Sequence, residues 1–521
     1  MAVLTTARRD SINPGATEVN CRAASSSWDG GVVSGPNEPP VQSNAARIRQ
    51  MAAEIPDALA YVHVANDGSE SVWTWAELDR RSSQLAGALQ GRGLAVGDRL
   101  GLGLRNSPEL VLAVFAAWKL GAVPVPIRWD IPDWELQRLR SVIDARIYVD
   151  ETDLQWIAST SELDVPALAD TQSPYSNGIC SSGSTGTPKV ILRAQPSVFD
   201  PLLTPLMEGW RPVPRPQTIL VLAPMYHANG FATLSNLLAG DRLVGVDKFD
   251  AGRTVDVIER HRVTTFTATP TMLQRIADLP GVDERDLSSI DWILQGAAPM
   301  PASLVDRWAD LVGIERIVMA YGMTEGLGIT AIRGDEWLSH RGSVGRGHRD
   351  TEIRVCDGDA NDVPPGEIGE IYLRSSAYGG YLYLGGAPQL RSTDDGFHTA
   401  GDLGYLDRDG FLYVVDRRVD LIVSGGANVY PAEVEAALID HPAIADVVVV
   451  GLRDDEWGRR VHAIVEPADP AAPPAVAEVI AYAKARLAPY KVPKTIELVD
   501  AIPRSEATKV NRGALVQARG G

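Results

Sequence analysis

Short apolar runs separated by amphipathic segments dominate the chain from about residue 46 onward. Runs of this kind predict strands of parallel sheets that are buried on both faces by helices. The pattern therefore indicates an α/β protein. The expected strands are 99–104, 123–127, 218–224, 242–246, 264–270, 291–298 and 316–322.

Two helix starts carry clear local signals. Thr74 and Glu77 have the spacing of a capping box, in which each side chain satisfies a free backbone group of the first helical turn. Ser107 followed by Pro108 predicts a second helix with proline at its first position, and Gly121 is expected to end it.

The last hundred or so residues differ from the rest. We expect a separate α+β unit there, joined to the larger part near residues 416–420. The expected strands of this unit are 421–426, 446–452, 461–467 and 494–499. The expected helices are 431–440 and 475–487, and a Pro/Ala linker at 469–474 precedes the second helix.

Composition narrows the function classes. The net charge of −18 argues against nucleic acid as a partner, and no apolar run approaches the ~18–20 residues of a membrane-spanning helix. The three cysteines are scattered, which is typical of reduced thiols in a cytoplasmic protein. Residues 1–45 are rich in Ala, Ser, Asn, Gly and Pro, so we expect a largely disordered extension without a signal peptide.

The segment ICSSGSTGTPKVI has the composition of a phosphate-binding loop. Gly183 and Gly186 allow backbone amides to turn inward, and Lys189 adds a positive charge. It is not a Walker A loop, because the spacing differs and Val190 stands where Ser or Thr is required. A Ser/Gly-rich surface loop is the alternative reading. The hydroxyl donors are Ser181, Ser182, Ser184, Thr185 and Thr187.

Three further segments occur in a suggestive order: AYGMTEG at 320–326, TAGDLG at 399–404 and PRSEATKVNR at 503–512. Together with the phosphate-type loop they resemble the adenylate-forming superfamily. This superfamily contains acyl- and aryl-CoA synthetases, adenylation domains of nonribosomal peptide synthetases, and luciferases. The resemblance covers about residues 46–515, and SGGANVYPAEVE at 424–435 is most similar to the CoA ligase branch.

The resemblance implies a fold and a reaction. The expected fold is a large N-terminal domain (46–416) of parallel-rich sheets flanked by helices, with a distorted β-barrel part. A hinge (417–419) and a small mobile α+β C-terminal domain (420–521) follow. The implied enzyme is an acid-thiol ligase that converts a carboxylic acid and ATP to an acyl-AMP. The thiol of coenzyme A then displaces AMP.

The resemblance also assigns roles to single residues. Glu325 should hold Mg²⁺ and Thr324 should contact phosphate. Tyr321 should stack on adenine, while Asp402 and Arg417 should bind the ribose. Each role has an alternative. Glu325 could be a solvated loop acid and Tyr321 a core tyrosine. Asp402 could simply form a turn, and Arg417 an interdomain ion pair.

Lys509 is expected to bridge the substrate carboxylate and the α-phosphate, and His227 to border the acyl pocket. Solvated charge and a satisfied buried histidine are the respective alternatives. The other positions expected to bind ATP, AMP or coenzyme A are Ser181, Ser182, Gly183, Ser184, Thr185, Gly186, Lys189, Gly296, Ala297, Ala298, Gly322, Gly425 and Gly426.

The expected pocket indicates the type of acid. Relatives that activate amino acids have Asp where this chain has Ala228, which disfavours an amino acid substrate. Small and apolar walls favour a bulky hydrophobic acid that is fatty, aryl, or polycyclic as in steroids and terpenoids. The wall residues, in addition to His227, are Asn229, Gly230, Phe231, Thr267, Met323 and Leu327.

Two departures from the family pattern leave alternatives open. Val419 stands at the hinge where Asp or Lys is usual, and Thr508 replaces the glycine before Lys509. A specialised member that makes the thioester from a preformed acyl-adenylate is therefore one alternative. A ligase that loads a carrier protein and a non-catalytic nucleotide-binding module are the others. The assembly, including a homodimer, also stays open.

Overall fold

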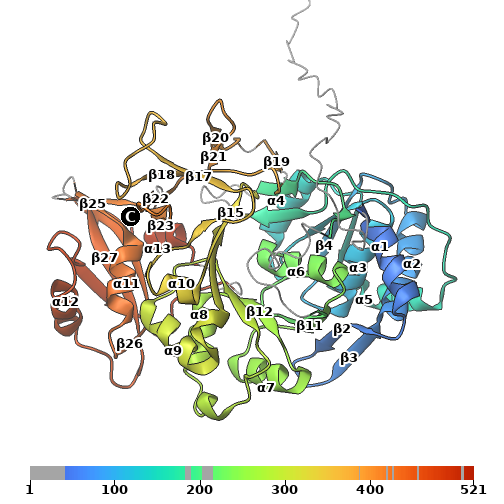
Figure 1. The fold of residues 1–521 in the computed structure, drawn as a ribbon, viewed down its shortest axis with the longest axis horizontal. Coiled ribbons are helices and arrows are strands. Elements are labelled where there is room, and N and C mark those ends of the chain that lie inside the picture. Colours follow the sequence, from blue (N-terminus) through green and yellow to red (C-terminus); the bar gives the residue numbers. More distant parts are fainter. Residues whose placement is uncertain are drawn as a thin grey trace, which may run out of the picture. The chain divides into compact units, whose positions relative to one another are not determined.

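A nine-stranded sheet forms the centre of the larger part of the molecule (Figure 1). The computed structural model describes residues 41–181, 189–201, 215–378, 380–386, 388–417, 420–424, 427–454, 457–505 and 510–520. The sheet has the strand order β16 (Arg346–Gly347), β15 (Ile329–Arg333), β14 (Ile317–Gly322), β13 (Trp292–Gln295), β12 (Thr265–Ala268), β10 (Thr218–Val221), β11 (Arg242–Val246), β2 (Leu59–Val64) and β3 (Glu70–Thr74).

The six strands from β14 to β2 in this order run parallel to one another. The pairs β2–β3, β14–β15 and β15–β16 are antiparallel. Each predicted strand between residues 218 and 322 is therefore confirmed. Consecutive residues of a strand point to opposite faces. Ile219 and Val221 accordingly pack into one core, and Leu220 and Leu222 into another.

Helices cover both faces of this sheet. One group is α1 (Asn44–Glu54), α2 (Trp75–Gly91), α3 (Pro108–Lys119), α5 (Leu154–Ser159) and α6 (Ala228–Leu238). The other is α7 (Ala251–His261), α8 (Pro270–Ala277), α9 (Ala302–Val312) and α10 (Gly334–Trp337). In Figure 1 the labels α1, α2 and α3 stand together, and so do α7, α8 and α9.

The predicted helix starts are confirmed. The Thr74 side chain accepts from the backbone N–H of Glu77 at 3.3 Å, and Ser107 accepts from the N–H of Leu110 at 3.2 Å. The α3 helix is buried along almost its whole length because it is apolar on every face. Among the described residues, no helix combines the length and the apolarity needed to cross a membrane.

Besides the pair β1 (Gln42–Ser43) and β9 (Val198–Phe199), the described residues of the larger part form three smaller sheets. A parallel one has the order β5 (Val123–Pro126), β4 (Arg99–Gly103) and β6 (Ile147–Asp150), with α4 (Asp133–Ile143) preceding β6. The part expected as a distorted barrel consists of two sheets with open strand orders. The first has the order β19 (Tyr381–Leu384), β8 (Lys189–Arg193) and β7 (Gly178–Ser181). The second has the order β20 (Arg391–Ser392), β21 (His398–Thr399), β18 (Gly369–Arg374), β22 (Asp402–Leu406) and β23 (Leu412–Arg417), and β17 (Glu352–Cys356) also pairs with β18.

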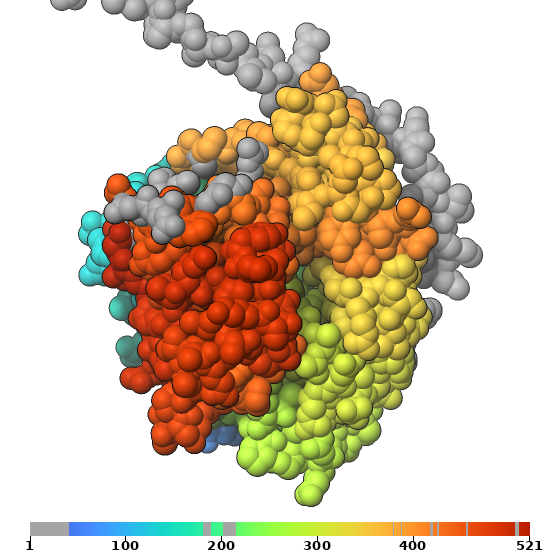
Figure 2. All heavy atoms as spheres, turned by 90° about the vertical axis from the view of Figure 1, so that its left-hand side faces the viewer, coloured from blue at the N-terminus to red at the C-terminus, as the bar shows by residue number. Residues whose placement is uncertain are grey.

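The C-terminal residues form the predicted α+β unit, which is drawn in orange to red in Figure 2. One face of its sheet packs against α11 (Pro431–Ile439) and α12 (Val476–Lys484), and the other against α13 (Arg512–Ala518). The strand order is β25 (Ala427–Val429), β24 (Ile422–Ser424), β27 (Gly458–Pro467) and β26 (Ile444–Asp454), with β28 (Thr495–Leu498) on β27.

The expected end of the disordered extension at residue 45 lies too far along the chain. Residues 42 and 43 form β1 (Gln42–Ser43), which pairs with β9 (Val198–Phe199). Ser43 then caps α1 by accepting from the N–H of Ala46 at 2.9 Å. Ser43 and Ala45 are buried, so the large domain begins no later than residue 42.

Candidate active site

The predicted site segments follow neighbouring parallel strands of the central sheet. Segment 223–231 follows β10, 269–270 follows β12, 296–298 follows β13 and 323–328 follows β14. Because β14, β13, β12 and β10 are adjacent and parallel, these segments lie along one edge of the sheet. The carboxyl edge of a parallel sheet is where such folds bind ligands.

The phosphate-type loop joins two paired strands. The β7 strand ends at Ser181 and the antiparallel β8 strand begins at Lys189. The loop residues themselves lie outside the described part of the chain, so their predicted contacts stay predictions. They include Ser182, Gly183, Ser184, Thr185 and Gly186.

Lys189 lies in a cluster with Glu325 and Tyr383. The Lys189 ammonium donates to Glu325 Oε1 at 3.2 Å and to the Tyr383 hydroxyl oxygen at 3.0 Å. The Tyr383 hydroxyl donates to the same Glu325 oxygen at 2.6 Å. Burial, followed by this hydrogen bond, raises the pKa of Tyr383 far above its usual value. The loop lysine and the predicted metal carboxylate are thus brought together.

Tyr383 is a site residue that the sequence analysis missed. It lies on β19, which pairs antiparallel with β8 and places Tyr383 opposite Ile191. The alternation Tyr-Leu-Tyr-Leu at 381–384 signals a strand with both tyrosines on one face. The pairing of this strand with β8 depends on segments far apart in the sequence.

Tyr321 and Asp402 also meet. The Tyr321 hydroxyl donates to Asp402 Oδ2 at 2.7 Å, and the Asp402 side chain is buried. Arg417, the other predicted ribose residue, is the register partner of Asp402 across β22 and β23. Three residues predicted to bind the adenosine part are therefore neighbours, although the Arg417 side chain is outside the described structure.

Hydrogen bonds between neighbouring residues hold the turn that precedes Asp402. Thr399 donates to Glu370 Oε1 at 2.9 Å and accepts from the backbone N–H of Gly401 at 3.0 Å. Glu370 is buried and also pairs with Arg391. The turn before Asp402 is therefore held by β18, which lies next to β22 in the sheet.

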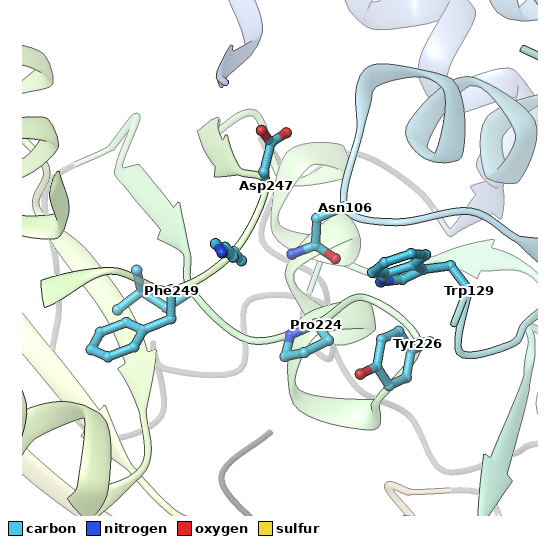
Figure 3. Close-up of a pocket in the computed structure, with 8 residues that line it drawn as sticks. Asn106, Trp129, Pro224, Tyr226, Asp247 and Phe249 are labelled. Atoms are coloured by element: carbon cyan, nitrogen blue, oxygen red, sulfur yellow. The ribbon is translucent and has the colours of Figure 1, made fainter. Parts of the chain in front are cut away.

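Asn106 holds the segment that leads to His227. Its amide donates to the carbonyl of Ala223 at 3.2 Å and accepts from the N–H of Met225 at 2.7 Å. His227 precedes α6, and its ring lies 4.5 Å from the ring of Tyr226. Figure 3 shows a small pocket beside Asn106, lined by Asn106, Trp129, Leu222, Pro224, Tyr226, Asp247, Lys248 and Phe249.

The predicted acyl-pocket residues differ in exposure. Asn229 is exposed, whereas Thr267 and Met323 are half-buried. Phe231 lies in the core, with its ring edge-on to Trp118 at 6.2 Å. Gly230, Leu327 and Gly322 are at the same edge; the first two are buried and Gly322 is exposed. Their contact with substrate stays a prediction.

Gly230 is a glycine for a steric reason. A Cβ there would lie 2.3 Å from the carbonyl oxygen of Pro224, which no side chain tolerates. The start of α6 therefore packs directly on the segment that Asn106 holds.

The segment after β13 is shaped by Gln295. Its buried side chain donates to the carbonyl of Ala298 at 2.6 Å and to that of Gly296 at 3.2 Å. Ala297, between them, has a left-handed φ of +72° and is exposed. This is an uncommon conformation for a residue with a side chain, and such strain often marks functional segments.

Glu325 and Thr324 suit a magnesium ion. Glu325 offers a carboxylate at the edge of the site, and Thr324 adds a half-buried hydroxyl beside it. Mg²⁺ prefers one or two carboxylates together with phosphate oxygens and water. The donor set at this point is thus of the right chemical type.

A second group of metal-type side chains lies elsewhere. Ligand atoms of His340, Asp407 and Asp409 come within 4.8 Å of one another. Asp407 already accepts from the N–H groups of Asp409 and Phe411 at 2.9 Å each, which closes a turn. These contacts account for the cluster as local structure.

Lys509, Gly425 and Gly426 lie outside the described residues, so their roles stay predictions. The flanks of the Lys509 segment are described. Arg504 pairs with Asp446 at 2.6 Å, and Arg512 with Glu435 at 2.7 Å. Both ends of the segment are therefore tied to the core of the C-terminal unit.

Known proteins match the whole architecture. The chain matches the family model for AMP-binding enzyme over residues 48–382 and that for the AMP-binding enzyme C-terminal domain over residues 433–509. A feruloyl-CoA synthase from Amycolatopsis sp is 34% identical over 84% of this chain and 92% of the relative. A long-chain-fatty-acid–CoA ligase from Mycobacterium tuberculosis is 31% identical over 90% of this chain and 97% of the relative.

Among solved structures, the o-succinylbenzoate CoA synthetase of Bacillus subtilis in complex with its acyl-adenylate intermediate superposes with a TM-score of 0.78. It is 27% identical, and the match covers 92% of this chain and 98% of that one. The similarity thus spans the parallel-sheet part and the C-terminal unit alike.

Proposed function

Since the chain belongs to the AMP-binding enzyme family and is an AMP-forming acyl-CoA ligase, we propose that its substrate is a bulky hydrophobic carboxylic acid. The candidates are a fatty, an aryl and a polycyclic acid. The observation behind this proposal is that the predicted acyl-wall positions carry no Asp, Glu, Lys or Arg; Thr267, Met323 and Leu327 are examples. A buried charge without a partner would be costly there, so an apolar acid is favoured.

The names of the relatives support this choice. Feruloyl-CoA synthase and the long-chain-fatty-acid–CoA ligase each act, by name, on an acid with a large apolar part. We also propose a cytoplasmic location, on the basis of the three scattered cysteines.

In the first half-reaction the acid's carboxylate attacks the α-phosphate of ATP, and pyrophosphate leaves. Both reactants are anions, so cations must offset their repulsion. Lys189 would supply one charge to the phosphates. Glu325 and Thr324 would hold Mg²⁺, which supplies further charge neutralisation when bound. Lys509 would join the two reacting groups.

Asp402 would hold the nucleotide through the ribose hydroxyls. In the structure Asp402 accepts from Tyr321 at 2.7 Å, so the two residues would act on adjacent parts of the adenosine. In the second half-reaction the sulfur of coenzyme A attacks the acyl carbonyl near the predicted position of His227, and the thiol proton passes to solvent. AMP then leaves with the electrons of the acyl–phosphate bond.

The test is a panel of carboxylic acids supplied with ATP and coenzyme A. Pyrophosphate, AMP and thioester are followed separately. Fatty, aryl and polycyclic acids should give stoichiometric AMP and thioester, and amino acids should give neither. Pyrophosphate release without AMP or a CoA thioester would instead favour a carrier protein as the acceptor. Preference for a short or charged acid would overturn the hydrophobic assignment.

A second candidate is a specialised member with weak adenylation. Val419 at the hinge and Thr508 before Lys509 favour it, although both lie outside the described residues. Exposing Val419 during a domain rotation would cost up to about 1.5 kcal/mol. A synthetic acyl-adenylate with coenzyme A isolates the second half-reaction. Equal rates for the two halves would remove this candidate.

A further inference from the structure

A second cation lies on the same face of β8 as Lys189. Residues two and four apart on a strand share a face, so Arg193 points to the same side as Lys189 and Ile191. Lys189 begins the strand at the site, and Arg193 ends it. Unlike Lys189, Arg193 has no role in the sequence analysis or in the proposed chemistry.

Arg193 is half-buried and has no acid beside it in the part of the chain that the structure describes. Its Nε donates to Gln195 Oε1 at 3.3 Å, and Gln195 donates in turn to the carbonyl of Ala377 at 3.1 Å. Among the residues that the structure describes, no carboxylate forms an ion pair with Arg193. Burial lowers the pKa of Arg193, and Tyr378 is the one titratable group that opposes this shift. Burying an unpaired charge is unfavourable, so its presence calls for a reason.

Tyr378, the neighbour of Arg193, also has a polar group without a hydrogen-bond partner within the described ranges. Its ring is buried, and its hydroxyl has no hydrogen-bond partner in the described structure. Burial raises the pKa of Tyr378 to about 12, while the charges of Arg193 and Arg349 act in the opposite direction. The acid near Tyr378, Asp350, is engaged elsewhere, because it accepts from the N–H of Ser376 at 2.7 Å.

The Arg193 guanidinium lies against the glycine that follows Glu325. A Cβ on Gly326 would lie 3.3 Å from Arg193 Nη1 and 3.3 Å from the carbonyl oxygen of Tyr378. Gly326 has a left-handed φ of +65°, and its N–H donates to the carbonyl of Met323 at 3.0 Å. Arg193 therefore packs directly beneath the turn that carries Glu325.

We propose that Arg193 is a positioning residue for Glu325. It packs against Gly326, the residue after Glu325, and contributes a positive charge that no described carboxylate pairs with. The inference rests on the proposed role of Glu325 in binding Mg²⁺. It predicts that Arg193 matters for the binding of Mg·ATP and for adenylation, and that the thioester half-reaction does not need it.

The primary test is calorimetric binding of ATP in the presence and absence of Mg²⁺. Arg193→Met removes the charge at similar length and should weaken Mg·ATP binding about tenfold, with at most about a twofold loss for ATP alone. Arg193→Lys keeps the charge without the planar group and should fall between Met and wild type. Equal losses with and without Mg²⁺, or no loss, would overturn the proposal.

Arg242 provides a matched control. It begins β11, at the opposite edge of the central sheet from the site. Its pKa is also lowered by burial, and its guanidinium donates to neutral oxygens of Thr218 at 2.9 Å and His261 at 2.7 Å. Arg242→Met should lower the melting temperature and leave the affinity for Mg·ATP unchanged. A loss of Mg·ATP affinity in this variant would show a general effect of removing a buried arginine.

Glu325→Gln separates this inference from the proposed function on which it rests. If this variant binds Mg·ATP as wild type does, the metal assignment itself fails. If Glu325→Gln loses the Mg²⁺ effect but Arg193→Met does not, only the positioning role fails. Thioester formation from a supplied acyl-adenylate should be normal in Arg193→Met, and a parallel loss there would indicate misfolding. Should the Met variant not fold, Arg193→Lys decides through the same comparison.

Discussion

Two lysine clusters in this molecule have the same ingredients and opposite settings. Lys189 contacts a carboxylate and a hydroxyl, those of Glu325 and Tyr383. Lys119, at the end of α3, does the same with Asp79 at 2.6 Å and Ser83 at 2.7 Å. The Lys189 side chain is 24% exposed, and the Lys119 side chain is 0% exposed.

The difference lies in the donors that remain. An ammonium group has three donors. Lys119 uses all of them, because it also donates to the Asp79 carbonyl at 2.6 Å. Lys189 has two acceptors in the described structure, so one donor and some open surface are left for an anion. The Lys189 cluster therefore differs from the structural Lys119 cluster in two respects: one N–H donor of its ammonium group is unused among the described residues, and its side chain is partly exposed.

The largest expected effect is that of Glu325→Gln. Removing the carboxylate takes away the predicted metal ligand and the counter-charge of Lys189. Adenylation should slow by about 100- to 1000-fold, the range found when one electrostatic contact to a transition state is lost. Pyrophosphate release at saturating acid measures this. Thioester formation from a supplied acyl-adenylate is the control, and a rate near wild type in both assays would contradict the assignment.

The second effect concerns Lys119 and pH. Burial lowers its pKa to about 8 from 10.5, although Asp79 acts in the opposite direction. The folded state therefore binds fewer protons than the unfolded state between these values. The free energy of unfolding should rise as the pH increases from about 8 to about 10.5, by up to roughly 3 kcal/mol.

Denaturant titrations of wild type and Lys119→Met over this pH range isolate the effect. Below pH 8 the cost of the buried charge is fully present in wild type, and above 10.5 it is gone. The Met variant should lack this rise. Identical pH slopes for the two proteins would mean that the Lys119 ammonium is better stabilised than its burial indicates.

The third test asks whether the exposed fraction of a side chain is enough to tell a ligand-binding residue from a structural one. Asp402 is only 4% exposed, as in a structural cluster, yet it is predicted to bind ribose. Asp402→Ala should weaken AMP binding by about 1.5–3 kcal/mol, the range for a charge-assisted hydrogen bond. Calorimetry with AMP checks this, with Tyr321→Phe as the variant that keeps the carboxylate. Unchanged affinity would place Asp402 with Lys119 as a structural residue.

The smallest effects come from a matched pair of hydroxyl deletions. Tyr383→Phe should raise the KM for ATP about fivefold, which corresponds to a net hydrogen bond of roughly 1 kcal/mol. Ser83→Ala should lower the free energy of unfolding by a similar roughly 1 kcal/mol and leave the KM unchanged. If the two variants exchange their effects, the comparison between the clusters is wrong.

Much of the fold could be predicted because its signals are local. The strands from 218 to 322 are apolar runs, and the starts of α2 and α3 depend on caps within four residues. The start of the domain could not be predicted in this way. Arg47 and Ser43 are polar but buried, and Arg47 donates to the carbonyl of Leu238 at 2.8 Å, which is distant in sequence.

The same division applies to the site. Lys189, Glu325, Tyr321 and Asp402 lie in motifs whose residue types fit their chemistry, and the structure brings them together in pairs. Tyr383 and Arg193 lie in ordinary-looking strands. Their contacts arise from strand pairing between segments that local patterns do not connect.

Asn106 lies apart from the strands that carry the predicted nucleotide-binding residues. It follows β4 of a small sheet and fixes the segment before His227, whereas the nucleotide-side residues are carried by β8, β14, β19 and β22. For protein engineering, the acyl side can therefore be redesigned from the Asn106 region while the ATP-handling frame is kept. A library that varies residues 228, 229 and 231, with Asn106, His227 and Gly230 kept, would test new acids while the predicted nucleotide-binding residues stay unchanged.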